Sequence, residues 1–87
     1  MKNGMELEGK NVLIRTVTNF YTGRVITENS KFLELENAAW IADTGRFSDA
    51  LASSIFGEVE PYPLPVIVMK AAMVDVTGIG ELPTKQK

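Results

Sequence analysis

Apolar and polar residues alternate in the first half of the chain in a way that predicts three successive β-strands. Residues 11–18 are rich in β-branched side chains and predict a strand that is buried on both faces. Residues 20–27 predict a second strand with Gly23 at its centre, where a glycine marks a bulge, a sharp bend or a close approach of another backbone. The polar segment 28–31 then predicts a turn into a third strand, residues 32–41.

The third strand has the most regular alternation in the chain. One predicted face holds Leu33, Leu35, Ala39 and Ile41, and the other holds Phe32, Glu34, Glu36 and Trp40. This pattern predicts a strand that covers a core on one side and meets solvent on the other. A short bent meander leaves two unpaired edges, so it needs more strands, or more copies of the chain, to be stable.

The alternation stops after the third strand, and residues 42–64 are predicted to form a connection. Ser48 is expected to cap a short helix that starts at Asp49, and Gly57 is expected to end it. The segment EPYPLP is expected to be extended and polyproline-like, because proline and the residue before it both disfavour helix. Three aromatic side chains are expected to cover this connection: Trp40, Phe47 and Phe56.

Two more strands are predicted after the connection. Residues 65–69 form the fourth strand, the segment KAA forms a tight turn, and residues 73–79 form a fifth strand at an edge of the sheet. The sequence therefore predicts an all-β protein, a small and strongly bent five-stranded barrel with a helix-containing insertion between strands 3 and 4.

The expected organisation is one domain with a short segment at either end. Residues 1–10 are expected to form an N-terminal arm, residues 11–78 the barrel domain, and residues 79–87 a polar C-terminal tail. A chain of 87 residues is long enough for one domain, although its core as a monomer would be modest.

Composition narrows the range of functions. The chain has no cysteine and no histidine, so the usual nucleophile–base pairs cannot be assembled, and we expect neither an enzyme nor a metal or other cofactor. Eleven acidic residues against nine basic ones argue against binding nucleic acid through bulk charge, so the cations would have to gather at one site. The N-terminus has no apolar leader and no apolar run approaches the ~18 residues of a membrane span, so we expect a cytoplasmic protein without a membrane partner.

Two segments carry a resemblance to a known family. YTGRV, a polar turn and FLELENA resemble the first Sm motif, in which a mid-strand glycine precedes a loop and a strand of alternating leucines that ends in an acidic–polar pair. VIVMKAAMVDV is similar to the second Sm motif, in which a strand ends in a cation and a small residue before a short last strand. The chain therefore resembles a divergent member of the Sm-like (Sm/LSm) family over residues 11–41 and 65–78, and a viral, phage or bacterial source fits such a divergent copy.

The resemblance implies a Sm-like barrel that forms a homo-oligomeric ring of five to seven copies, in which the fourth strand of one subunit pairs with the fifth strand of the next. It also implies that the loops after the second and fourth strands line the pore and bind single-stranded nucleic acid, RNA ahead of DNA. The residues of this chain in those loops are Asn29, Ser30, Lys31, Phe32 and Lys70. Repetition around a ring would give a net acidic protein a basic annulus, and an aromatic side chain there could stack on a base.

Two alternatives stay open. The same ring could be a scaffold or adaptor that binds protein partners without nucleic acid, because the chain is net acidic and Lys70-Ala71 stands where the family usually has Arg-Gly. The strands could also form a monomeric five-stranded barrel of another type, such as an OB-like fold. The mass of the protein in solution distinguishes a monomer from a ring.

Overall fold

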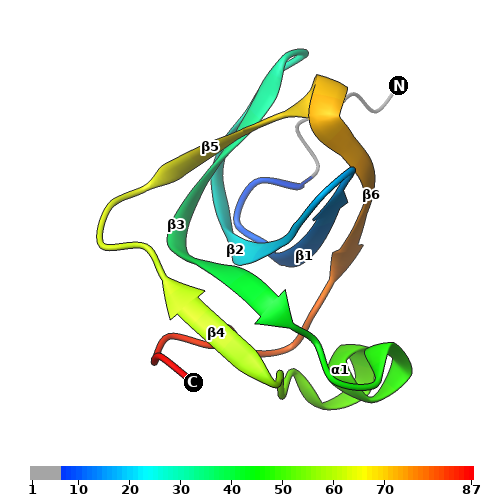
Figure 1. Cartoon of the computed structure of the whole chain (residues 1–87). Coiled ribbons are helices and arrows are strands. Elements are labelled where there is room, and N and C mark those ends of the chain that lie inside the picture. Colours follow the sequence, from blue (N-terminus) through cyan, green and yellow to red (C-terminus); the bar gives the residue numbers. More distant parts are fainter. Residues whose placement is uncertain (1–6) are drawn as a thin grey trace.

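Figure 1 shows the computed structural model of the chain, which describes residues 7–87 as a strongly bent antiparallel sheet with one short α-helix. The strands are β1 (Asn11–Thr16), β2 (Phe20–Glu28), β3 (Phe32–Asp43), β4 (Glu58–Pro61), β5 (Val66–Met69) and β6 (Met73–Gly78). The helix α1 (Phe47–Ser53) lies between β3 and β4, and a 3-10 helix, η2 (Lys70–Ala72), lies between β5 and β6. The prediction of an all-β fold is confirmed, but the sheet has six strands rather than the five expected.

The strand order is β4-β3-β2-β1-β6, and β5 also pairs with β3. The long strand β3 therefore has two partners along one edge, β5 beside its first half and β4 beside its second half (Figure 1). The amide of Tyr62, between these two partners, donates to the carbonyl of Ala38 at 2.8 Å and keeps the chain against β3. Within residues 7–87 no ladder joins β5 to β6, so the sheet is bent around itself without closing.

The bend occurs where β2 passes Gly23. Opposite this glycine, β3 carries an extra residue at Asn37–Ala38, and Asn37 has a φ of 50°. A Cβ atom on Gly23 would lie 2.8 Å from the Cβ of Leu35 and 3.3 Å from that of Ala38, so only glycine lets the two strands approach this closely. The prediction that Gly23 marks a bulge and a close backbone approach is confirmed.

The bulge in β3 divides the buried side chains into two clusters, one on either face of the sheet. The first core holds Val12, Ile14, Val25, Leu33, Leu35, Ala38 and Val68, and the second core holds Leu13, Ala39, Ile41, Ala50, Phe56 and Val59. Strand β1 contributes to both cores, so the prediction that it is buried on both faces is confirmed. The prediction that Leu33, Leu35, Ala39 and Ile41 share one face is wrong, because the extra residue shifts the alternation between Leu35 and Ala39.

The connection between β3 and β5 differs from its predicted form. Helix α1 begins at Phe47 after an N-cap residue, Arg46, that makes no side-chain capping bond, and it ends at Ser54 in the left-handed conformation. Neither Ser48 nor Gly57 therefore acts as a cap. The helix places Ala50 in the second core.

Segments that were expected to be less regular also pair with the sheet. Strand β4, Glu58–Pro61, includes the first two residues of the segment 60–65 that was expected to be extended and polyproline-like, and Gly57 lies so close to β3 that its Cβ would be 3.0 Å from the side chain of Asp43. At the N-terminal end, the amide of Gly9 donates to the carbonyl of Val25 at 2.7 Å. The rest of the expected N-terminal arm, residues 1–6, lies outside the described residues. In the described part of the chain, no helix has the length and apolar character needed to cross a membrane.

Candidate nucleic-acid interface

The turn between β2 and β3 is built around the side chain of Asn29. Its Oδ1 accepts hydrogen bonds from the backbone amides of Lys31 and Phe32 at 2.8 and 2.9 Å. The amide of Asn29 donates in turn to the carbonyl of Phe32 at 3.1 Å. The turn is thus fixed by an asparagine side chain acting as a backbone mimic, and the acceptor oxygen of Asn29 is already used within the turn.

The same end of the sheet also receives the connection from β5 to β6. Phe32 pairs with Met69 in the ladder between β3 and β5, and the amide of Lys70 donates to the carbonyl of Lys31 at 2.8 Å. The tip of the β2–β3 hairpin and η2 consequently lie next to each other at one end of the molecule (Figure 1). All five residues singled out from the sequence are brought to this end: Asn29, Ser30, Lys31, Phe32 and Lys70.

A buried glutamate at this end was not expected from the sequence. Glu28 is 4% exposed, and its Oε2 accepts a hydrogen bond from Nζ of Lys70 at 3.0 Å. Its Oε1 accepts a bond from the backbone amide of Leu7 at 3.2 Å. Glu28 thus links Leu7 to the β5–β6 connection, and it holds the ammonium group of Lys70 in an ion pair.

A second bulge explains why the position of Glu28 was missed. Val25 pairs with Leu35 but Thr27 pairs with Glu34, so β2 carries an extra residue at Ile26. After that residue, Glu28 lies opposite Leu33 of the first core instead of facing solvent. From the sequence, Glu28 belongs to the polar segment 28–31, and no signal separates it from the turn.

The five residues differ in what they can offer a ligand. Asn29, Ser30 and Lys31 are exposed, Phe32 is partly buried, and Lys70 is partly buried against Glu28. Lys31 makes no ion pair with any residue in the range 7–87. The arrangement therefore presents one free ammonium, an amide nitrogen and a hydroxyl per chain, with the second ammonium held behind them by a carboxylate.

Among the described residues there is no group of three or more Asp and Glu side chains that could hold a metal ion. Comparison with protein-family models, with curated proteins and with solved structures finds no match to this chain.

Proposed function

We propose that this protein is a Sm-like barrel that assembles into a homo-oligomeric ring and binds single-stranded nucleic acid, RNA ahead of DNA. The binding residues would lie at 29–32 and at Lys70. The observation that carries the proposal is the contact between these two loops, in which the amide of Lys70 donates to the carbonyl of Lys31 at 2.8 Å. A pair of loops with two lysines, an asparagine and an aromatic side chain offers the groups that contact phosphates and bases.

The strand order supports the Sm-like part of the proposal. Without β4, the order is β6-β1-β2-β3-β5, which is a bent meander whose last strand returns to pair with the first. A single turn of 3-10 helix separates the last two strands. Strand β4 and α1 both belong to the segment 42–64, which the sequence resemblance treats as an insertion between the third and fourth barrel strands.

The unpaired edges support assembly into a ring. Strands β5 and β6 each pair on one side only within the described residues. Three apolar side chains of these two strands are about half exposed, namely Ile67 at 52%, Met69 at 49% and Val74 at 56%. Pairing β5 of one copy with β6 of the next would cover both edges and these side chains, which is the physical reason to expect cyclic closure.

The nucleic-acid part of the proposal relies on repetition of Lys31. One free lysine contributes little as a monomer, but five to seven copies around a pore would form a ring of ammonium groups. Each would contact a phosphate, and the amide nitrogen of Asn29 would donate to a base edge. Because few phosphates are neutralised per subunit, the affinity should fall less steeply with salt than it does for a basic nucleic-acid-binding domain.

Two measurements on one sample test the proposal. Light scattering after gel filtration should give a mass five to seven times that of the 9.6-kDa chain, and a monomeric mass would remove the ring. Fluorescence anisotropy with U-rich, A-rich and mixed RNA oligonucleotides, and with DNA of the same sequences, should then show binding that Lys31→Ala weakens at least tenfold. Lys85→Ala removes the same charge far from this end and should leave the affinity unchanged. Equal affinities for the two variants would show that Lys31 does not bind the nucleic acid and would refute the proposed site.

A second candidate is a ring that acts as a scaffold for protein partners and binds no nucleic acid. The ion pair between Lys70 and Glu28 favours it, because a cation already held by a buried carboxylate has less to gain from a phosphate. This candidate predicts a ring-sized mass and no saturable binding of any of the oligonucleotides. Binding that depends on Lys31 would exclude it.

A further inference from the structure

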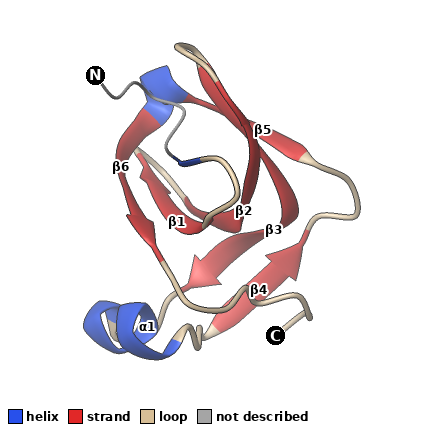
Figure 2. Cartoon of the chain, turned by 180° about the vertical axis from the view of Figure 1, so that it is seen from behind, coloured by secondary structure: helices blue, strands red, loops and turns tan. Residues whose placement is uncertain are grey.

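The end of the C-terminal segment 79–87 pairs with the outer edge of β4. The amide of Val59 donates to the carbonyl of Lys87 at 2.7 Å, and the amide of Lys87 donates to the carbonyl of Val59 at 3.0 Å. Two residues that exchange both hydrogen bonds form an antiparallel pair, so the chain adds the beginning of a further strand to the sheet. Both cartoon views show this segment running from the end of β6 to lie alongside β4 (Figures 1 and 2).

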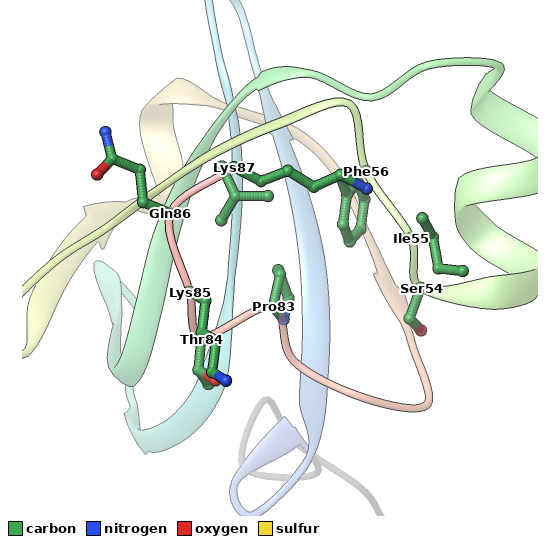
Figure 3. Close-up of a pocket in the computed structure, with 9 residues that line it drawn as sticks. Ser54, Ile55, Phe56, Pro83, Thr84, Lys85, Gln86 and Lys87 are labelled. Carbon is green, nitrogen blue, oxygen red and sulfur yellow. The ribbon is translucent and has the colours of Figure 1, made fainter.

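The segment does not fill the space beneath it. A pocket of about 330 Å³ lies between it and the chain that joins α1 to β4. The apolar side of this pocket is formed by Ile55, Phe56 and Val59, and Ile55 is 64% exposed. The opposite side is formed mainly by the polar residues 84–87 after Pro83. Figure 3 shows these side chains around the pocket.

Lys87, the residue paired with Val59, is a charged residue at an apolar position of the edge. Directly opposed residues in an antiparallel pair direct their side chains to the same face, so Lys87 falls on the face where Val59 enters the second core. In Figure 3 the side chain of Lys87 extends toward Phe56. A lysine can cover apolar atoms with its methylene groups, but its ammonium must stay hydrated, so it cannot fill the pocket as an apolar side chain would.

The residues on either side of Val59 determine which charges a strand paired with β4 should carry. Glu58 and Glu60 flank Val59 and are exposed, whereas the segment beside them reads Lys85-Gln86-Lys87. Nε2 of Gln86 donates to Oε1 of Glu60 at 3.4 Å, and Gln86 points away from the pocket in Figure 3. The edge therefore combines a buried apolar position with acidic positions on either side of it, and it favours a strand of basic residues around an apolar one.

We propose that the outer edge of β4 is a docking site for an extended segment of a protein partner in which lysine or arginine alternates with apolar residues. The partner segment adds a strand to β4 by the hydrogen bonds that Lys87 now makes. Its apolar side chain packs against Phe56 and Ile55, the apolar wall that residues 84–87 now cover, and its basic side chains face Glu58 and Glu60. Residues 84–87 are the occupant within the chain and give way to the partner, whereas Ile79, Gly80 and Glu81 stay hydrogen-bonded to Asn11 and Ser54.

This site is independent of the proposed nucleic-acid interface. In Figure 1 the edge of β4 lies at the opposite end of the molecule from the β2–β3 turn and η2. The free edges of β5 and β6 that would form a ring are also not part of it. The proposal therefore holds whether or not the protein forms a ring or binds nucleic acid.

Labelled peptides test the proposal on the full chain by fluorescence anisotropy. The peptide TKVKVT should bind saturably, whereas TEVEVT and TKSKST, which reverse the charge or remove the apolar residues, should bind at least tenfold more weakly. Lys87→Pro removes the amide that donates to Val59 and frees the edge, so it should raise the affinity for TKVKVT at least threefold. Lys87→Ala keeps the amide and is the matched control, expected to give a smaller increase. Glu60→Lys should lower the affinity at least tenfold.

Three results would overturn the proposal. One is the absence of saturable binding of TKVKVT to Lys87→Pro when circular dichroism shows that this variant is folded. Another is an affinity that Glu60→Lys leaves unchanged. A third is a concentration-dependent mass that Lys87→Pro abolishes, because that would assign the edge to the same segment of a second copy. Lys31→Ala, at the other end of the molecule, should not alter peptide binding in any of these experiments.

Discussion

Replacement of Gly23 by alanine is expected to destabilise the protein through one contact. The added Cβ would lie 2.8 Å from the Cβ of Leu35, a separation that real Cβ atoms essentially never show. Shortening the side chain at position 35 cannot relieve this contact, because the Cβ is present in every residue except glycine. Strands β2 and β3 must therefore separate at the bend, which costs about 1–3 kcal/mol for an overpacked core. In a domain of this size each kcal/mol lowers Tm by about 4–8 °C.

The control for this variant is Gly78→Ala in β6. A Cβ at Gly78 would meet nothing closer than the carbonyl oxygen of Asn11 at 3.9 Å, which is an ordinary contact. Alanine there should be neutral or slightly stabilising, because it restricts the unfolded chain. Urea unfolding of both variants at one protein concentration, followed by circular dichroism and tryptophan fluorescence, measures the difference in unfolding free energy. Equal stabilities would refute the inference that Gly23 is required by the close approach of the two strands.

Three further predictions follow from single side chains. Asn37 has a positive φ, so Asn37→Ile should cost about 1–2 kcal/mol and Asn37→Gly should cost little; equal unfolding free energies in urea would argue against a strained bulge. Lys70→Met leaves the carboxylate of Glu28 buried without its cation and should cost about 1–3 kcal/mol, part of which Glu28→Gln in the same chain should restore; urea midpoints check both. Burial, and then the neighbouring Tyr21, raise the pKa of Tyr62 above its usual 10.0, so the unfolding free energy should fall as pH rises from about 10 through that raised pKa. Tyr62→Phe should reduce this dependence, and a phenolate absorbance titration that shows Tyr62 ionising at or below 10 would contradict it.

The sequence predicted the elements of the sheet better than it predicted which side chains share a face. Strand β1 was expected to be buried on both faces, and Gly23 was expected at a bend, because β-branched runs and mid-strand glycines are local signals. The bulge at Asn37–Ala38 left a weaker signal, a single asparagine, which is disfavoured in strands and tolerates a positive φ but does not by itself mark a bulge. Trp40 was expected to cover the connection 42–64; it pairs with Glu60 of that connection, and its Nε1 donates to Oδ1 of Asn19 at 3.2 Å.

In the candidate interface too, the sequence predicted which loops lie together better than it predicted which side chains are buried. The two loops were placed together by a family resemblance, and the structure does bring Lys31 and Lys70 into contact through their backbones. What the sequence could not show was the partner of Lys70, because Glu28 becomes buried only through a bulge two residues before it. Likewise, residues 79–87 resemble a solvated tail by composition, and their pairing with Val59 depends on an edge that exists only after β4 has formed.

The pairing of the first strand with the last has a consequence for how the molecule is made. Strand β1 pairs with β6, and the ion pair that joins Arg15 to Asp75 spans 60 residues of chain. Strand β1 leaves the ribosome long before β6 has been synthesised. The nascent chain therefore exposes a strand that is buried on both faces in the final fold, because one of its two partner strands does not yet exist. Because so long a loop must close, we expect folding to take milliseconds to seconds, as is typical of β-proteins whose strand pairs are far apart in sequence. In the cell, folding should therefore follow the synthesis of Gly78, and ribosome-bound chains that stop before β6 should be more sensitive to protease than chains that include it.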